Sequence, residues 1–355
     1  MRFRSRLIAC AACAACTSAP SNAPDGGGSD ASVDASTASD AGSTSDAADA
    51  TAPRDPALWP FTSDSPWNVP LATTAQYESA TGAETSTLLA SASKSYVNRT
   101  AYSFPVYVAA SSDPLATLTY ASGYVNGKGG SGSVSIHVPA GAAPSSGTDS
   151  SIVIVTPDHQ TGWESWQFAG TAPNFTTSYT VEQDLTGTGW GAGVHAAGCS
   201  LMGGLIRGWE LAALHIPHAL AVGIATTQAL SPQVWPATSE DSGAKTSYTG
   251  TVPMGALVAL DPSADVETLA TTPEGKALGH ALQDYGAYVI DTAGTTTGLG
   301  FVVDPEGTTD AQANALRTDV AALASHVRVV TNNAVSTPGG GDTSATRRAP
   351  LAPPL

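Results

Sequence analysis

Carboxylate, imidazole and indole side chains are concentrated in one short segment, residues 158–167, with the letters DHQTGWESWQ. In an extended strand Glu164 and Trp166 point to the same face, because successive side chains alternate. Glycosidases use two carboxyl groups, one as acid and one as base or nucleophile, and the flat face of a sugar packs on an indole ring. The segment therefore predicts a glycan groove with Glu164 and either Asp158 or Asp149 as the carboxyl pair. The alternative is an ordinary hairpin with core tryptophans and a turn capped by Asp158.

Histidines form a second group of candidates. His218 can act as a general base if a carboxylate such as Glu210 orients its ring; the alternative is a core histidine. The spacings of His195 with Cys199 and of His215 with His218 lack a complete zinc signature, so no metal site is predicted. No cofactor is expected, except a divalent cation if the substrate is acidic. The candidate catalytic residues are Glu164, Asp158, His159, His218 and Asp149, and the candidate substrate-binding residues are Trp163, Trp166, Trp190 and Arg207.

Two of the binding candidates have simple structural alternatives. Trp190 stands between glycines and either stacks on a sugar or anchors its loop. Arg207 lies three residues before Glu210, and this spacing is also typical of a surface ion pair along one helix.

Short strands are the predicted elements that carry these residues. Runs rich in β-branched and aromatic residues, bounded by Gly, Pro, Ser or Asp, predict strands at 103–109, 134–138, 151–155, 163–168, 179–181, 288–290 and 327–330. Capping signals and helical periodicity predict helices at 275–285 and 310–326, with a shorter one at 205–214. The sequence therefore predicts a mainly β (α+β) fold, an antiparallel β-sandwich or jelly roll with two or three embedded helices.

The first sixteen residues indicate export. Three arginines precede a short apolar run and three cysteines, Cys10, Cys13 and Cys16, a pattern typical of a bacterial lipoprotein signal. Nine apolar residues are too few for a membrane span, which needs about twenty. We expect lipidation at Cys16, with Cys10 and Cys13 as alternatives.

Composition divides the remaining chain into three parts. Residues 17–56 consist mainly of Ser, Ala, Asp, Thr and Gly and predict a disordered acidic linker. Residues 57–336 predict a single β-rich globular domain, long enough for a sizeable core. Residues 337–355, with a glycine run and a proline-rich end, predict a disordered tail.

Charge is sparse and mostly acidic. Charged residues make up 12% of the chain and the formal net charge is −16; between positions 57 and 336 there are 22 acidic and 8 basic residues, a net −14. A surface of hydroxyl and amide groups suits neutral polar partners. Nucleic acid is excluded, because phosphate binding requires a basic patch, and an acidic polysaccharide would need a bridging cation.

Four phrases resemble landmarks of a widespread group of secreted bacterial proteins of unknown function. They are SPWN at 65–68, LMGGLIR at 201–207, IPHAL at 216–220 and QDYGAYV at 283–289. The resemblance covers residues 59–291. It implies an extracellular, mainly β domain with embedded helices, and it implies no catalytic residue.

The expected function is therefore that of a lipoprotein with a glycan-active domain. We expect a glycoside hydrolase or lyase that acts on extracellular polysaccharide or a cell-surface glycan; the alternative is a non-catalytic carbohydrate-binding or cell-surface interaction module. We expect a monomer outside the cytoplasm, attached to the bacterial cell envelope, at the outer membrane or cell surface, only through its lipid anchor.

Overall fold

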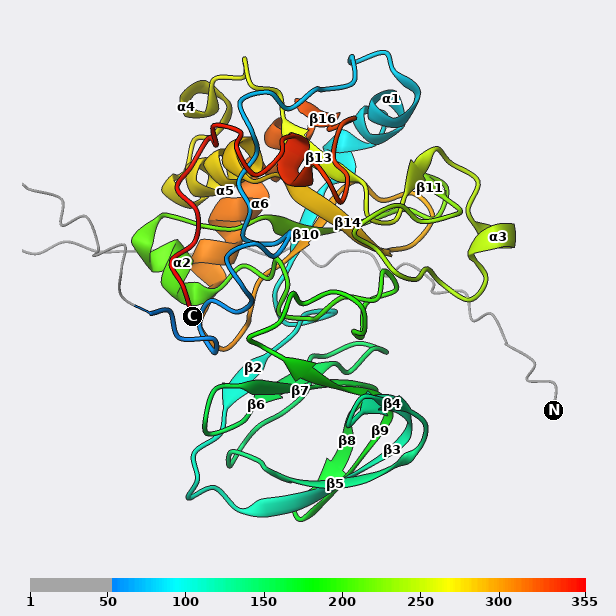
Figure 1. The fold of residues 1–355 in the computed structure, drawn as a ribbon, viewed down its shortest axis with the longest axis vertical. Helices are drawn as coiled ribbons and strands as arrows, with labels where there is room; N and C mark the ends of the chain where they lie inside the picture. The colour runs from blue at the N-terminus through cyan, green and yellow to red at the C-terminus, as the bar shows by residue number, and fades with distance from the viewer. Residues whose placement is uncertain (1–52) are drawn as a thin grey trace, which may run out of the picture. The chain divides into compact units, whose positions relative to one another are not determined.

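Two mixed β-sheets organise the part of the chain that the structure, a computed structural model, describes, residues 53–355 (Figure 1). These residues belong to one unit, Asp49–Leu355. The predicted signal peptide, Cys16 and the predicted linker up to residue 52 lie outside the described residues.

The first sheet is built from the N-terminal half of this unit. Its strands run in the order β2-β6-β7-β9-β3-β4, with β5 paired to β3 and β8 paired to β9. One face buries Leu118, Ile154 and Trp163 in a core of its own. The strands are β2 (Val106–Val108), β3 (Leu115–Val125), β4 (Lys128–Gly129), β5 (Gly132–His137), β6 (Ile152–Val155), β7 (Thr161–Trp166), β8 (Ala169–Thr171) and β9 (Asn174–Asp184).

The second sheet has the order β1-β15-β10-β14-β13-β16. Helices α5 and α6 lie beside it (Figure 1), and its apolar strands contribute to the larger core. The strands are β1 (Tyr96–Asn98), β10 (Leu220–Ile224), β13 (Leu257–Leu260), β14 (Ala287–Thr292), β15 (Gly300–Val302) and β16 (Val327–Val329). A separate pair consists of β11 (Ala229–Leu230) and β12 (Val252–Pro253).

The two longest helices begin at side-chain caps. Thr272 accepts a hydrogen bond from the backbone N–H of Gly275 (3.0 Å) at the start of α5, and Thr309 forms a capping box with Gln312 at the start of α6. The helices are α1 (Ala83–Leu89), α2 (Gly208–Ala213), α3 (Ala244–Ser247), α4 (Val266–Leu269), α5 (Pro273–Asp284) and α6 (Asp310–Ala324). None of the helices within residues 53–355 has the length and apolar character needed to cross a membrane.

The predicted mainly β, α+β class is confirmed, and the three predicted helices correspond to α2, α5 and α6. The sheets contain both parallel and antiparallel pairs, whereas we expected antiparallel pairs throughout. Parallel pairs join β2 to β6, β3 to β9, β1 to β15 and β10 to β14. Each pair brings together segments that are distant in the sequence, and strand propensity does not show which distant strands become neighbours.

The prediction of a disordered tail at 337–355 is wrong. The backbone N–H of Arg54 donates to Pro354 O (2.8 Å), and that of Arg348 donates to Leu71 O (2.9 Å). The Arg54 guanidinium also donates to the carbonyls of Trp59 (3.0 Å) and Phe61 (2.6 Å). Segments rich in Gly and Pro stay ordered here because other segments satisfy their backbone groups. The domain therefore begins before residue 57 and includes the C-terminal segment.

Candidate functional site

A cleft formed by two adjoining cavities holds the most reactive arrangement of side chains. The cavities measure about 490 and about 310 Å³, within the range of ligand pockets. We call it the His195 cleft and define it by the residues that both cavities share: Phe104, Asp149, His195, Asp291 and Thr292.

Asp149 reaches the cleft because the β6–β7 pairing continues beyond the strands. The backbone N–H of Gln167 donates to Asp149 O (2.7 Å), which places the carboxyl group beside Trp166. The indole N–H of Trp166 donates to Asp149 Oδ1 (3.3 Å). Burial and the nearby Asp291 carboxylate raise the pKa of Asp149, and the hydrogen bond from Trp166 only partly opposes them. Asp149 therefore holds its proton more readily than an ordinary aspartate.

His195 is carried by a hairpin whose ends meet at the bridge between Trp190 and Cys199. The hairpin docks on β14, where the N–H of Ala197 donates to Ile290 O (3.0 Å). The next residue on β14, Asp291, has its Oδ2 3.3 Å from His195 Nδ1. This contact favours the tautomer with the proton on Nδ1.

The other ring nitrogen of His195 is unused. His195 is 5% exposed, and its Nε2 has no hydrogen-bond partner among the described residues. A buried polar atom without a partner costs free energy, so a ligand or water that bonds to Nε2 would be stabilised here. In chemical terms, Asp291 orients His195, a lining residue of the cleft whose unpartnered Nε2 is buried.

Aromatic side chains and further oxygen atoms complete the walls. Trp166, at 37% exposed, lines the smaller cavity together with Asp241. Asp241 accepts hydrogen bonds from the hydroxyls of Tyr248 (2.6 Å) and Thr292 (3.0 Å). Among the described residues, neither Lys nor Arg lines either cavity. The cleft is acidic and aromatic, and its walls offer carboxylate oxygens and an indole ring to a ligand.

Glu164, the first predicted catalytic carboxylate, lies outside this cleft. Its side chain is fully buried, accepts a hydrogen bond from the Ser200 hydroxyl and leaves Oε2 without a partner among the described residues. Burial raises the pKa of Glu164 to about 7, although the Ser200 hydrogen bond opposes the shift. The predicted glycan groove around Glu164 does not form, because Glu164 is buried and Trp163 fills the core of the first sheet. Of Glu164, Trp163 and Trp166, only Trp166 lines the His195 cleft.

Asp158 and His159 belong to the turn that joins β6 to β7. Asp158 accepts hydrogen bonds from the Thr156 hydroxyl (2.6 Å) and the backbone N–H of Gln160 (3.1 Å), and the Thr156 bond lowers its pKa. His159 Nδ1 lies 2.7 Å from Asp55 Oδ1. These contacts correspond to the structural alternative, a capped turn, and neither residue reaches the His195 cleft.

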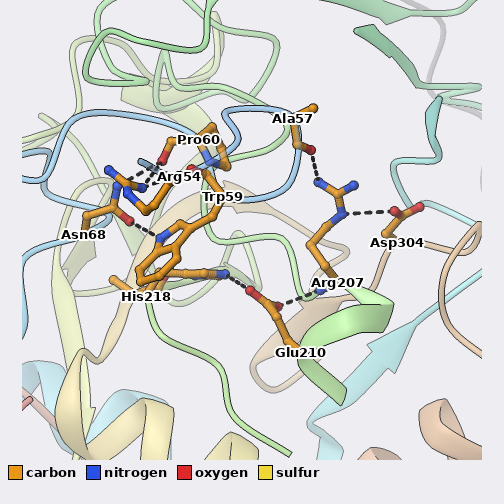
Figure 2. A network of polar contacts seen from close by, with 10 residues as sticks. Arg54, Ala57, Trp59, Pro60, Asn68, Arg207, Glu210, His218 and Asp304 are labelled. Carbon is orange, nitrogen blue, oxygen red and sulfur yellow. Dashed lines mark hydrogen bonds and ion pairs between the residues drawn. The ribbon is translucent and has the colours of Figure 1, made fainter. Parts of the chain in front are cut away.

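His218 and Glu210 form the expected pair, but in a buried network (Figure 2). His218 Nε2 lies 2.7 Å from Glu210 Oε1, and Nδ1 lies 2.9 Å from Ala219 O. Burial lowers the pKa of His218, but the Glu210 carboxylate outweighs it and raises the pKa above the usual value. Both nitrogens are therefore engaged, and the ring has none left to act as a base on a substrate.

Arg207 belongs to the same network, and not to a surface ion pair or a binding surface. Its Nε lies 3.0 Å from Asp304 Oδ2, and its Nη1 donates to Ala57 O (3.2 Å) (Figure 2). Glu210 bonds to the backbone N–H of Arg207 (2.7 Å) and caps α2. The network joins helix α2, the N-terminal segment and the loop after β15.

Trp190, the third candidate tryptophan, packs against the core through Trp67. Their rings stack with centroids 4.8 Å apart, and Tyr288 meets Trp67 edge-on at 5.6 Å. A Cβ at Gly203 would lie 2.5 Å from the Trp67 ring, so only glycine permits this approach. The N–H of Ala219 donates to Trp67 O (2.7 Å). Each of the four landmark phrases thus contributes a residue to the packing around the buried Trp67, which gives all four a structural role.

A scan against protein-family models and searches of curated proteins and of solved structures return no match to this chain. The resemblance to secreted bacterial proteins stays a prediction. Function has to be argued from the geometry of the site.

The described residues contain no group of three or more His, Cys, Asp or Glu side chains placed to hold a metal ion. His195 and Cys199 lie at the two ends of a backbone hydrogen bond (3.3 Å), and His218 is paired with Glu210. Neither zinc-like spacing therefore gathers a set of ligands within residues 53–355.

Of the residues predicted from the sequence, Asp149 and Trp166 line the His195 cleft, whereas Asp291 and a role for His195 in this site were not predicted. A signal for Asp291 exists, because it directly follows the predicted strand at 288–290, and residues at the ends of strands commonly carry function. The pairing of Asp291 with His195 depends on the hairpin docking on β14, which no local pattern indicates.

We expect Glu164→Gln to remove a pH dependence of stability. Burial raises the pKa of Glu164 from 4.5 to about 7, so between these values the folded protein holds a proton that the unfolded chain releases. The free energy of unfolding should fall as pH rises through this window, by about 1.4 kcal/mol per pH unit, and the Gln variant should lack this term. Urea unfolding of both proteins at about pH 5 and about pH 8 measures how the free energy of unfolding changes with pH. Equal changes in the two proteins would contradict the assignment.

Proposed function

We propose that the described domain is a glycoside hydrolase that acts on neutral extracellular polysaccharide in the His195 cleft, as the soluble part of a tethered lipoprotein. One observation carries the proposal. An unpartnered, buried His195 Nε2, oriented by Asp291, shares a cleft with Asp149, whose raised pKa favours the protonated acid. A proton acceptor and a proton donor beside one cavity are what hydrolysis of an acetal requires.

The reaction can be written with these groups. Water attacks the anomeric carbon while His195 Nε2 accepts its proton, and Asp291 stabilises the imidazolium that forms. The bond from the anomeric carbon to the leaving oxygen breaks, and Asp149 donates its proton to that oxygen. The exposed face of Trp166 beside Asp149 offers a surface for a sugar ring. Solvent then takes the proton from His195 and returns one to Asp149, which restores both groups.

The charge of the cleft favours hydrolysis of a neutral glycan over a lyase reaction. A lyase on uronic acids must neutralise the substrate carboxylate, and the cavity walls supply Asp149, Asp241 and Asp291 without a Lys or Arg among the described residues. Like charges would repel an acidic chain. A hexose or pentose polymer carries no such charge.

Release of reducing ends from a panel of soluble neutral polysaccharides tests the function. We expect the full chain to cleave at least one glucan, xylan, mannan or galactan, and to leave polyuronates intact. Binding to a polysaccharide without new reducing ends would favour the non-catalytic carbohydrate-binding alternative. Cleavage of polyuronates alone, with unsaturated products, would replace the hydrolase by a lyase.

A further inference from the structure

A third cavity, of about 580 Å³, lies on the first sheet outside the two cavities of the His195 cleft. We call it the distal cavity. Its lining includes Tyr124, Tyr179, Glu182, Gln183 and Asp184. Among the described residues that line it there is again no Lys or Arg.

Three aromatic rings connect this cavity with the His195 cleft across consecutive strands. Trp166 on β7 is the direct antiparallel partner of Tyr179 on β9. Tyr124 on β3 is the partner of Val181, two residues along β9 from Tyr179. Since alternate residues share a face and neighbouring strands lie about 4.8 Å apart, the three rings form a row on one face of the sheet. Trp166 is 37% and Tyr124 41% exposed.

Gln183, which lines the distal cavity, has a buried acceptor without a partner. Gln183 is 7% exposed and lies on the same face as Tyr179, four residues away on β9. Its Nε2 donates to Asp184 O (3.1 Å), but its Oε1 has no partner among the described residues. A ligand hydroxyl would satisfy this oxygen, as buried acceptors require.

The hairpin that carries His195 lines both spaces. Gly191, Ala192 and Gly193 border the distal cavity, and the next residues, Val194 and His195, border the His195 cleft. The two spaces are therefore neighbours along one hairpin and along one row of aromatic rings.

We infer that the distal cavity binds further sugar units of the chain that is cut in the His195 cleft. This inference rests on the proposed function and extends it: the substrate is a neutral polymer that occupies both spaces, and it is cleaved within the chain. Tyr179 and Tyr124 provide stacking faces, and Gln183 Oε1 accepts a hydrogen bond from a sugar hydroxyl. A short oligosaccharide would fill the His195 cleft alone.

Two variants of the full chain test the inference, Tyr124→Ala and Gln183→Met. Kinetics are measured on the neutral polysaccharide that wild type cleaves best and on its short oligosaccharides. For the polymer we expect KM to rise about tenfold in Tyr124→Ala, equivalent to about 1.4 kcal/mol, and kcat/KM for the shortest cleaved oligosaccharide to stay unchanged. Tyr124→Phe, which keeps the ring, should restore polymer binding. Leu115→Ala, an exposed change at the other end of β3, is the matched control.

Each outcome separates the inference from the proposed function. Wild-type kinetics of Tyr124→Ala and Gln183→Met on both substrates would overturn the distal site and leave hydrolysis intact. Polymer binding that depends on Tyr124, measured by affinity electrophoresis, without release of reducing ends would overturn hydrolysis and support the distal site. A wild-type chain that neither binds nor cleaves any neutral polysaccharide would overturn both.

Discussion

Asp149→Asn is expected to lower the turnover of a neutral glycan by about 10²- to 10⁴-fold, the usual contribution of a general acid. Asn cannot donate the proton that the leaving oxygen needs. Its amide oxygen can still accept the hydrogen bond from Trp166, which in the native protein spans 3.3 Å to Asp149 Oδ1. The loss should therefore appear in kcat, with KM and the folded state nearly unchanged. Initial rates measure kcat and KM, and circular dichroism measures the folded state.

The pH profile provides a second readout of the same variant. The Asp149 carboxyl must be protonated to act, and burial with the Asp291 carboxylate raises its pKa. Activity should fall as pH rises through this raised pKa, and Asp149→Asn should lack this limb in its residual activity.

Two other carboxyl groups of the region serve as controls for Asp149. Asp158→Asn alters only an exposed turn, and Glu164→Gln changes a buried group outside the cleft; both should keep turnover near that of wild type. If either abolished turnover while Asp149→Asn did not, the acid would be assigned to the wrong residue.

The largest effect on stability is expected for Arg207→Met, with a loss of about 3–5 kcal/mol in the free energy of unfolding. The side chains of Arg207 and Asp304 are 9% and 4% exposed, with 3.0 Å between Nε and Oδ2. Burial already raises the pKa of Asp304, and the Arg207 guanidinium opposes this shift. Without the guanidinium, an uncompensated carboxylate remains in the interior. Urea denaturation followed by tryptophan fluorescence measures the change.

A double variant separates the buried charge from the loss of packing. Arg207→Met with Asp304→Leu replaces both partners by apolar groups and should recover much of the lost stability. Lys276→Met is the control: Lys276 pairs with Glu267 at 2.7 Å, but the two side chains are 36% and 60% exposed, so the cost should be about 0–1 kcal/mol. Equal losses for Arg207→Met and Lys276→Met would contradict the role of the buried pair.

Local patterns predicted the elements that surround the site. Thr272 is a helix cap as its flanking residues indicate, and the run 151–155 is a strand because its β-branched side chains are buried on both faces. The same patterns misplaced Glu164. Its alternation with Trp163 was predicted correctly, but its face of the sheet packs against the Ser200 loop and not against solvent.

The sequence by itself determined the β-rich, α+β class, the principal strands and helices, and an acidic chain without a basic surface, because these depend on composition and on short-range periodicity. Tertiary structure alone decided which polar groups share the His195 cleft. Asp149, His195 and Asp291 come from a loop before β6, a hairpin and the strand β14, and they meet only because the hairpin docks on β14 and the β6–β7 pairing extends to residue 149. Hydrogen bonds between segments about a hundred residues apart produce no periodic pattern in the sequence. The arrangement of the cleft therefore could not be predicted from the sequence.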